Sequence, residues 1–544
     1  MRWTMSSLVA RLLLIAIGGA FLLTDAGPRA AYSQSSNHFL GNLSCSSVAC
    51  HGRPETSRDR AGVSLDEFAF WMHNDPHAKA ERLLDGQRFA DILTRMGAIE
   101  GDRIDQTTID RCAGCHDPLG LASRRQNVEQ SQRPTVTPLS GQVMGTRRAT
   151  NAGRGIGCES CHGPSEKWLA KHYERDARPA LLQSLGMSNT KNLFVRGQMC
   201  AACHVGSNDN DMNHDMIAAG HPELLFELTA YHAKLPKHWS NSRERIAQRD
   251  FEANLWAAGQ ITSATAALEL RTSRAQQAIA DTTPANEPSS WPEFAEFSCY
   301  ACHQRQRVPV DETAAKLLPT NPLVRNSPRE NDWSSALLEN VLQRRGTADG
   351  KAVRDFADGS QRPIWPTLFF SAAPAEKISP PLLENLRSTV SSFSVQTQAA
   401  SPLNARGLLA CVRDSLAVEP SWEKQCQILL ALAANERAYF DELNILYLRN
   451  QISSIERKSL ELETKPDQES LFELRSALAY AKGTRLPKVF HVTASAVGKN
   501  NFNPDANTGI GHPMQSNEIV DRLKQLIDRW DARHEQVSKR FSSN

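Results

Sequence analysis

The chain has 544 residues, a length that favours more than one domain. Of these residues 40% are hydrophobic and 22% charged, a globular composition that excludes a fibrous or disordered protein. The formal net charge is only +2, and Arg2, Arg11, Arg29 and Asp25 account for that surplus, so the remaining chain is near neutral. No basic stripe is present to replace the counter-ions of phosphates, which excludes a nucleic-acid-binding protein.

The first thirty or so residues are typical of a signal peptide. Basic residues flank the start of an apolar run from Leu12 to Leu23, and small residues follow it. This run suits the apolar core of a signal peptide better than a membrane span. We expect residues 1–33 to be removed, with cleavage after Ala26 or Ser33, and the protein to be exported to the periplasm or beyond. An uncleaved N-terminal anchor remains the alternative.

Residues 40–307 contain ten of the twelve cysteines, grouped in units that end in histidine. Four units have the spacing C-x-x-C-H, and the first unit has two extra residues between its cysteines. The attaching cysteines are Cys45, Cys50, Cys112, Cys115, Cys158, Cys161, Cys200, Cys203, Cys299 and Cys302. The histidines that follow them are His51, His116, His162, His204 and His303.

This spacing predicts five covalently attached c-type haems. Two thiols about one helical turn apart can reach the two vinyl groups of one porphyrin, and the next histidine then lies beneath the iron as its proximal ligand. A thioredoxin-type pair or a zinc knuckle does not need a histidine at that position. For the first unit an alternative remains, in which Cys50 forms a single thioether and Cys45 is free or oxidised.

Between the haem units we expect short helices and loops. The predicted helices are Asp66–Met72, Ser165–Tyr173, Pro222–Ala233 and a long one near Glu244–Ala280. Two stretches rich in proline follow, Thr283–Pro292 and Val308–Asn331, and the second predicts a domain boundary.

Residues 332–544 contain no haem unit and show the 3.6-residue periodicity of amphipathic helices. The predicted helices are Trp333–Arg345, Pro381–Val395, Trp422–Ile455, Glu469–Ala481 and Ser516–Phe541. The predicted fold is therefore mainly α, a haem domain with sparse secondary structure followed by a helical C-terminal region. Cys411 and Cys426 are expected to form a disulfide in an oxidising compartment, with two buried thiols as the alternative.

Eight further histidines lie in or just before the haem region and are candidates for the second axial positions. They are His38, His73, His77, His172, His214, His221, His232 and His238. This number exceeds the five that bis-histidine coordination requires, so counting alone does not assign them. Local context favours His77 at the start of a helix, His172 ten residues after His162, His214 and His221 around a short segment, and His238 before Trp239.

Three segments resemble the multihaem cytochrome c554 family, which is related to octahaem hydroxylamine oxidoreductase. They are Cys158-Glu-Ser-Cys-His-Gly-Pro with Trp168 and His172, Ala219-Gly-His-Pro-Glu-Leu, and Leu235-Pro-Lys-His-Trp. The resemblance covers roughly residues 40–305 and implies closely stacked haem pairs and mostly bis-histidine iron. It supports His77, His172, His221, His214 and His238 as distal ligands. This chain departs from the family in two ways. It has five units where the tetrahaem member has four, and the resemblance does not extend to the C-terminal region.

These features favour an electron-transfer protein with a redox-protein donor and acceptor, and with peripheral association to a membrane redox complex as an open alternative. A second hypothesis is an oxidoreductase acting on hydroxylamine, nitrite, nitric oxide or a sulfur species at one open haem. Tyr231 and His232 are candidates for its distal pocket, although a position on the face of a helix is favoured for them. No C-x-x-C-K unit is present, which removes the usual signature of pentahaem nitrite reductase. A third hypothesis is a docking role for residues 332–544.

Overall fold

The computed structural model divides into two compact units, each treated by itself below. The smaller contains Met1–Leu40 and Gly163–Met187, and the larger contains Gly41–His162 and Ser188–Asn544. The signal-peptide residues, the fifth haem unit and both proline-rich stretches lie wholly or largely outside the described residues. The structure describes residues 37–54, 64–100, 103–122, 155–208, 210–248, 250–280, 291–297, 331–344, 383–384, 387–388, 403–416, 421–482 and 516–541.

The described residues are mainly α-helical, as predicted. Strands β1 (Ile99–Glu100) and β2 (Arg103–Ile104) form one short antiparallel ladder. No helix among the described segments is long and apolar enough to cross a membrane. The smaller unit contains α7 (Pro179–Ser184). The larger unit contains, up to residue 297, η1 (Asn42–Cys45), α2 (Glu67–Asn74), η2 (Pro76–Leu84), α3 (Gln87–Arg95), α4 (Gln106–His116), α6 (Cys158–His162), α8 (Leu193–His204), α9 (His214–Ala219), α10 (Leu228–Lys234), α11 (Asn241–Ala247), α12 (Phe251–Ala280) and η4 (Phe294–Glu296).

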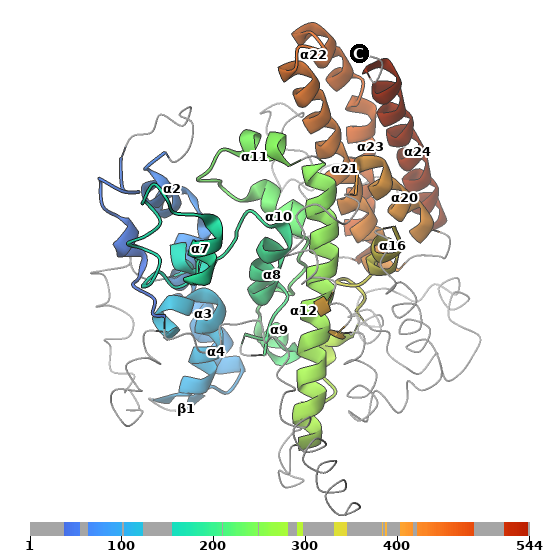
Figure 1. Ribbon diagram of the computed structural model, residues 1–544. Helices are drawn as coiled ribbons and strands as arrows, with labels where there is room; N and C mark the ends of the chain where they lie inside the picture. The colour runs from blue at the N-terminus through green and yellow to red at the C-terminus, as the bar shows by residue number, and fades with distance from the viewer. Residues whose placement is uncertain are drawn as a thin grey trace, which may run out of the picture. The chain divides into compact units, whose positions relative to one another are not determined.

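Helix α12 is the central element of the larger unit. It packs along α8 and α10, and Figure 1 shows it running beside α8. Small residues permit this close packing. A Cβ on Gly259 would lie only 2.7 Å from the Cβ of Leu228, so α10 would have to move to accept any larger residue there. A Cβ on Gly197 of α8 would likewise lie 2.5 Å from Thr262 Oγ1 of α12, so α8, which carries the fourth cysteine–histidine unit, also packs closely against α12.

The C-terminal helices extend the same hydrophobic core. Helix α21 packs against α12, α20, α23 and α24, and Figure 1 shows α21, α23 and α24 side by side. One apolar cluster of buried residues includes side chains from α8 and α12 as well as from the C-terminal helices, with Leu193 and Val537 as its first and last members. The proposed division between 40–307 and 332–544 stays a prediction. These helices are α16 (Leu338–Arg344), α20 (Ala405–Ser415), α21 (Trp422–Leu448), α22 (Ser454–Leu462), α23 (Lys465–Lys482) and α24 (Ser516–Phe541).

Five predicted helices differ from the observed ones. Two begin later than predicted, because residues 222–227 before α10 are not helical and residues 333–337 before α16 form turns. The long helix near Glu244–Ala280 is interrupted before Asp250, whose φ of 54° is left-handed and cannot continue a right-handed helix. Asn450 has a φ of 57° and likewise ends α21, after which a Ser453–Glu456 capping box starts α22. Residues Ser165–Tyr173 form successive turns instead of the predicted helix, and Lys171 N–H donates to the carbonyl three residues earlier.

The predicted disulfide between Cys411 and Cys426 is wrong for this structure. Neither cysteine forms a disulfide, and both are buried, in α20 and α21 respectively. The Cys411 thiol donates instead to the carbonyl oxygen of Asn340 at 3.4 Å. The two cysteines thus serve as small apolar residues in the interface between neighbouring helices.

Glu436 makes the stability of the helical region dependent on pH. Burial raises its pKa from 4.5 to about 7, although Gln468 Nε2 donates to its carboxylate at 2.6 Å. The folded state therefore binds this proton more tightly than the unfolded state, and the resulting stability is present below pH 4.5 and lost as pH rises through 7. Glu436→Gln should leave the free energy of unfolding nearly unchanged at pH 4.5 and raise it by roughly 3 kcal/mol at pH 8. Denaturant titrations at the two pH values check this, and an equal effect at both would contradict it.

Candidate haem-binding site

Three of the four C-x-x-C-H units lie at the last turn of an α-helix. Helices α4, α6 and α8 each end at the histidine of their unit. The two cysteines are three residues apart, so both thiols lie on one face of the helix. In the first unit, η1 ends at Cys45 and the extra residues form a turn closed by the Cys50 N–H donating to Ser47 O at 2.8 Å. Cys299, Cys302 and His303 lie outside the described residues.

Each of these three helices places its histidine opposite a histidine from a distant segment. The ring centroids of every pair are separated by 6.1–6.4 Å, and the ring planes cross at 64–78°. The pairs are His204 with His77, His116 with His221, and His162 with His238.

This spacing fits two imidazoles on opposite sides of one metal ion. A histidine nitrogen binds a transition metal at about 2.0–2.1 Å, and the ring centroid lies about 1.1 Å beyond it, so the two centroids should be about 6.3 Å apart. Rings stacked directly on each other would be closer and parallel. Among the described residues no three His, Cys, Asp or Glu side chains converge as a metal site, so these histidines occur in twos. Two axial nitrogens are what an iron already held by four porphyrin nitrogens requires.

The Nδ1 atoms of five candidate ligands are engaged, which leaves their Nε2 atoms for the metal. A carbonyl or carboxylate can only accept, so each of these Nδ1 atoms carries the proton. Ligating histidines are commonly oriented in this way by their second nitrogen. The acceptors are Glu67 for His51 at 2.9 Å, Asp75 for His77 at 2.9 Å, Ala80 O for His116 at 3.3 Å, Leu169 O for His172 at 2.6 Å and Pro222 O for His221 at 2.8 Å.

Burial keeps most of the paired imidazoles in the neutral form that binds metals. It lowers the pKa of His116, His221 and His238. Burial, together with positive charge on His77 and His116, lowers the pKa of His204 to about 4. Neutral imidazoles at physiological pH are the form that iron coordination requires.

The position of His221 depends on the end of α9. Gly220 caps this helix with a φ of 118°, a left-handed conformation that glycine adopts without steric cost. Arg88 donates to Gly220 O at 2.7 Å and Arg95 donates to Ala219 O at 3.0 Å. These contacts attach the segment that carries His221 to α3.

Cysteines of different units are close together in two places. The Cys45 and Cys158 thiols are hydrogen-bonded, which lowers the pKa of Cys45 to about 6 and raises that of Cys158. Asn42 Oδ1 also accepts from the Cys158 N–H at 3.0 Å, which joins the first unit to the third. The Cys115 and Cys203 thiols are hydrogen-bonded in the same way, which joins the second unit to the fourth.

Two further predicted ligands lie elsewhere. The His214 ring is 5.7 Å from that of Phe294, and Glu293 Oε1 accepts its backbone N–H at 2.8 Å. His214 is therefore next to the segment that leads into the fifth unit. His172 belongs to the smaller unit, where its ring lies 5.5 Å from that of Trp168.

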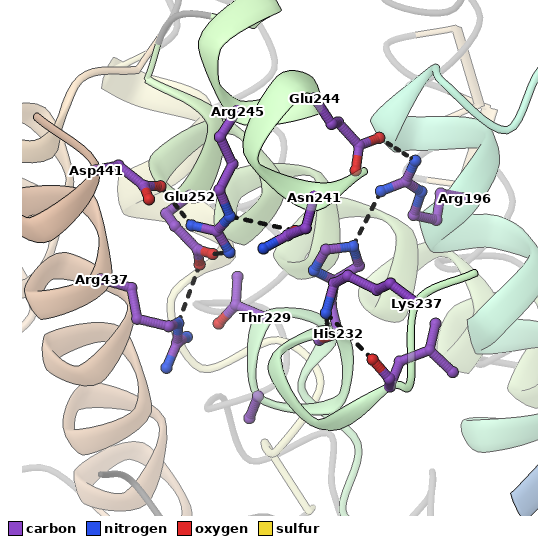
Figure 2. Close-up of polar contacts among 12 residues, drawn as sticks. Arg196, Thr229, His232, Lys237, Asn241, Glu244, Arg245, Glu252, Arg437 and Asp441 are labelled. Carbon is purple, nitrogen blue, oxygen red and sulfur yellow. Dashed lines mark hydrogen bonds and ion pairs between the residues drawn. The ribbon is translucent and has the colours of Figure 1, made fainter. Parts of the chain in front are cut away.

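His232 is buried and hydrogen-bonded to Arg196. Its Nε2 accepts from Arg196 Nη1 at 3.0 Å, which occupies the atom that would bind iron (Figure 2). Burial, with nearby cations such as Lys237, lowers its pKa to about 2. Tyr231, proposed for the same pocket, packs its ring 4.8 Å from that of His204. Both side chains therefore serve in packing and positioning.

The buried ionic network around His232 has no signal in the sequence. Arg245 pairs with both Glu252 and Asp441, and Arg437 Nε donates to Glu252 Oε2 at 3.1 Å (Figure 2). Arg196 also pairs with Glu244 at 2.5 Å. The network joins α8, α11 and α12 to α21, and periodicity within any one of these helices cannot reveal it.

No match to this chain was found among protein-family models, curated proteins or solved structures. The likeness to the cytochrome c554 family therefore depends on the sequence motifs, and the site is characterised by its thiol pairs and its opposed histidines.

Proposed function

We propose that the protein is an exported pentahaem c-type cytochrome, similar to the cytochrome c554 family, that transfers electrons between redox partners. The observation that carries this proposal is the set of three histidine pairs, each formed by a C-x-x-C-H histidine and a second histidine 6.1–6.4 Å away. A haem between two imidazoles supplies a one-electron couple whose potential depends on axial ligands and burial. Bis-histidine iron has no open position for a substrate, which favours a carrier over an enzyme.

The residues of this chain hold and orient those haems. The thiols of α4, α6 and α8 anchor the porphyrins, the histidines of the same helices bind one side of each iron, and His77, His221 and His238 bind the other. His214 is proposed for the haem of the fifth unit, because it contacts Glu293 and Phe294, which precede that unit in the chain. His172 stays a predicted distal ligand. Ion pairs between these segments also hold them together, such as Arg111 of α4 with Asp211, just before α9, at 2.7 Å.

Electron transfer needs haems that lie close together, and the contacts between thiols support two such pairs. The hydrogen bond between Cys45 and Cys158 supports a close pair formed by the first and third haems. That between Cys115 and Cys203 supports a close pair formed by the second and fourth haems. Close pairs of this kind would let an electron entering at one end reach the other without leaving the protein.

The haem stoichiometry can be measured directly. The intact holoprotein should exceed the mass of the mature chain by five haems of about 0.6 kDa each, because five cysteine–histidine units are present. Denaturing mass spectrometry checks this number. Cys45→Ser should leave the first haem attached through Cys50 alone and keep the count at five. A wild-type mass with four haems would contradict the assignment of the first unit.

The electron-transfer function is tested by the spin states and by turnover. We expect mostly low-spin haems in both oxidation states, and ferric electron paramagnetic resonance signals with large g anisotropy, because the three ring pairs cross at 64–78°. The reduced protein should give up its electrons to a soluble redox protein or dye. An open haem in the wild-type protein that binds carbon monoxide, with many cycles per second on hydroxylamine or nitrite, would instead establish the enzyme.

A further inference from the structure

The candidate axial histidines differ in the group that accepts their Nδ1 proton. Carbonyl oxygens accept it from His116 and His221, which form one pair. A carboxylate, that of Asp75, accepts it from His77, which pairs with His204. The second and fourth haem units, which lie next to each other through Cys115 and Cys203, thus have chemically different surroundings.

Asp75 is buried and its carboxylate is directed at His77. The residue is 6% exposed, and its Oδ1 accepts both the backbone N–H of His77 at 3.0 Å and the Nδ1–H at 2.9 Å. The first of these bonds caps η2 and holds the carboxylate in place. In the described part of the chain, His77 is the only ion-pair partner of Asp75, so no arginine or lysine neutralises its charge there.

A buried carboxylate on Nδ1 favours the ferric state of an iron bound at Nε2. The hydrogen bond increases the electron donation of the imidazole to the metal. The negative charge also attracts the ferric haem core, which carries one positive charge more than the ferrous core, and this attraction is strong where water is excluded. Carbonyl acceptors supply neither a full negative charge nor as strong a pull on the proton.

We propose that Asp75 is a positioning residue that acts through His77 to lower the reduction potential of the haem held by His77 and His204 below that of the haem held by His116 and His221. This inference depends on the proposed function. One electron then passes from ferrous iron at the fourth unit to ferric iron at the second, with no proton or further reactant required. Glu67 has the same relation to His51, but its side chain is 17% exposed against 9% for Asp75, so solvent weakens the effect of the Glu67 carboxylate more; the paired histidines are 28% and 36% exposed.

The experiment compares Asp75→Asn with a matched control in the intact holoprotein. The asparagine oxygen can still accept from the His77 Nδ1–H and cap η2, so the substitution removes the charge and keeps the contacts. Asp105→Asn is the control, since Asp105 caps α4 through Thr107 and Thr108 and contacts no histidine in the described residues. Redox titrations followed by optical and electron paramagnetic resonance spectra give the individual midpoint potentials.

In Asp75→Asn the ratio of ferrous to ferric iron at one haem should rise about tenfold at a fixed potential. The midpoint potential of that haem should therefore rise by about 59 mV for one electron. Haem content and the number of low-spin haems should not change. Asp105→Asn should leave every midpoint unchanged. In a His77→Met background, which itself raises the potential of the same haem, adding Asp75→Asn should give a smaller shift, because the imidazole that transmits the hydrogen bond is absent and only the direct attraction by the charge remains.

The proposal is overturned if Asp75→Asn leaves all midpoints unchanged, if Asp105→Asn shifts them equally, or if the shift is just as large in the His77→Met background. In each of these cases the haem count and spin states still support an electron carrier. If instead His77→Ala produces no high-spin haem, His77 is not a ligand, and this inference fails with that assignment while the other pairs are unaffected.

Discussion

In His221→Ala, one haem should become high spin and bind carbon monoxide when reduced, while the others stay low spin. His221 lies opposite His116 with a centroid separation of 6.4 Å, and its Nδ1 is engaged by Pro222 O, so its Nε2 is the atom available to the iron. Removing the ring leaves that iron with one protein ligand and an open sixth position. The measurement is the number of carbon monoxide molecules bound per reduced protein, together with the high-spin ferric signal.

Two further variants make the His221 result specific. His73→Ala is the control, because His73 is exposed in the last turn of α2 and should leave the spin states unchanged. His221→Met should keep the iron low spin and raise its potential, since a thioether favours ferrous iron more than imidazole does. If His221→Ala binds no more carbon monoxide than the wild type, the pairing of His116 with His221 is not axial coordination.

Glu252→Gln should destabilise the larger unit by about 3–5 kcal/mol, because it removes one partner from a buried ionic network. Glu252 is 1% exposed and accepts from Arg245 and Arg437. Glutamine keeps the volume of the side chain but leaves the Arg437 charge without its carboxylate partner. The free energy of unfolding measured by denaturant titration checks this prediction.

The control for Glu252→Gln is a carboxylate in an exposed ion pair. Glu535 pairs with Lys539 on the surface of α24, and Glu535→Gln should cause no measurable loss of stability. A loss of less than about 1 kcal/mol in Glu252→Gln would mean that the network carries little of the connection between α12 and α21. A loss confined to one spectroscopic probe would mean that those two helices unfold separately.

Local chemistry in the sequence is sufficient for predictions that depend on near neighbours. The C-x-x-C-H spacing places two thiols and a histidine on one helical turn, and α4, α6 and α8 have this geometry. The apolar periodicity of Ser516–Phe541 marks α24 at the correct bounds, because an amphipathic helix repeats every 3.6 residues wherever it packs. Helix ends were less predictable, since a single left-handed residue such as Asp250 or Asn450 interrupts the pattern without changing it.

The sequence alone determined that this chain carries four C-x-x-C-H units and a wider fifth one, a surplus of histidines and a mainly helical fold, since each is a property of composition or short spacing. Only the tertiary structure decided which histidine faces which. In the structure His77 faces His204, 127 residues away in the chain, and His232 is hydrogen-bonded to Arg196. Both contacts depend on how α8, η2 and α10 pack against one another. It also joined the C-terminal helices to α12 through buried charges from distant segments. Contacts between residues far apart in the chain follow from the packing of whole elements, and no local pattern encodes them.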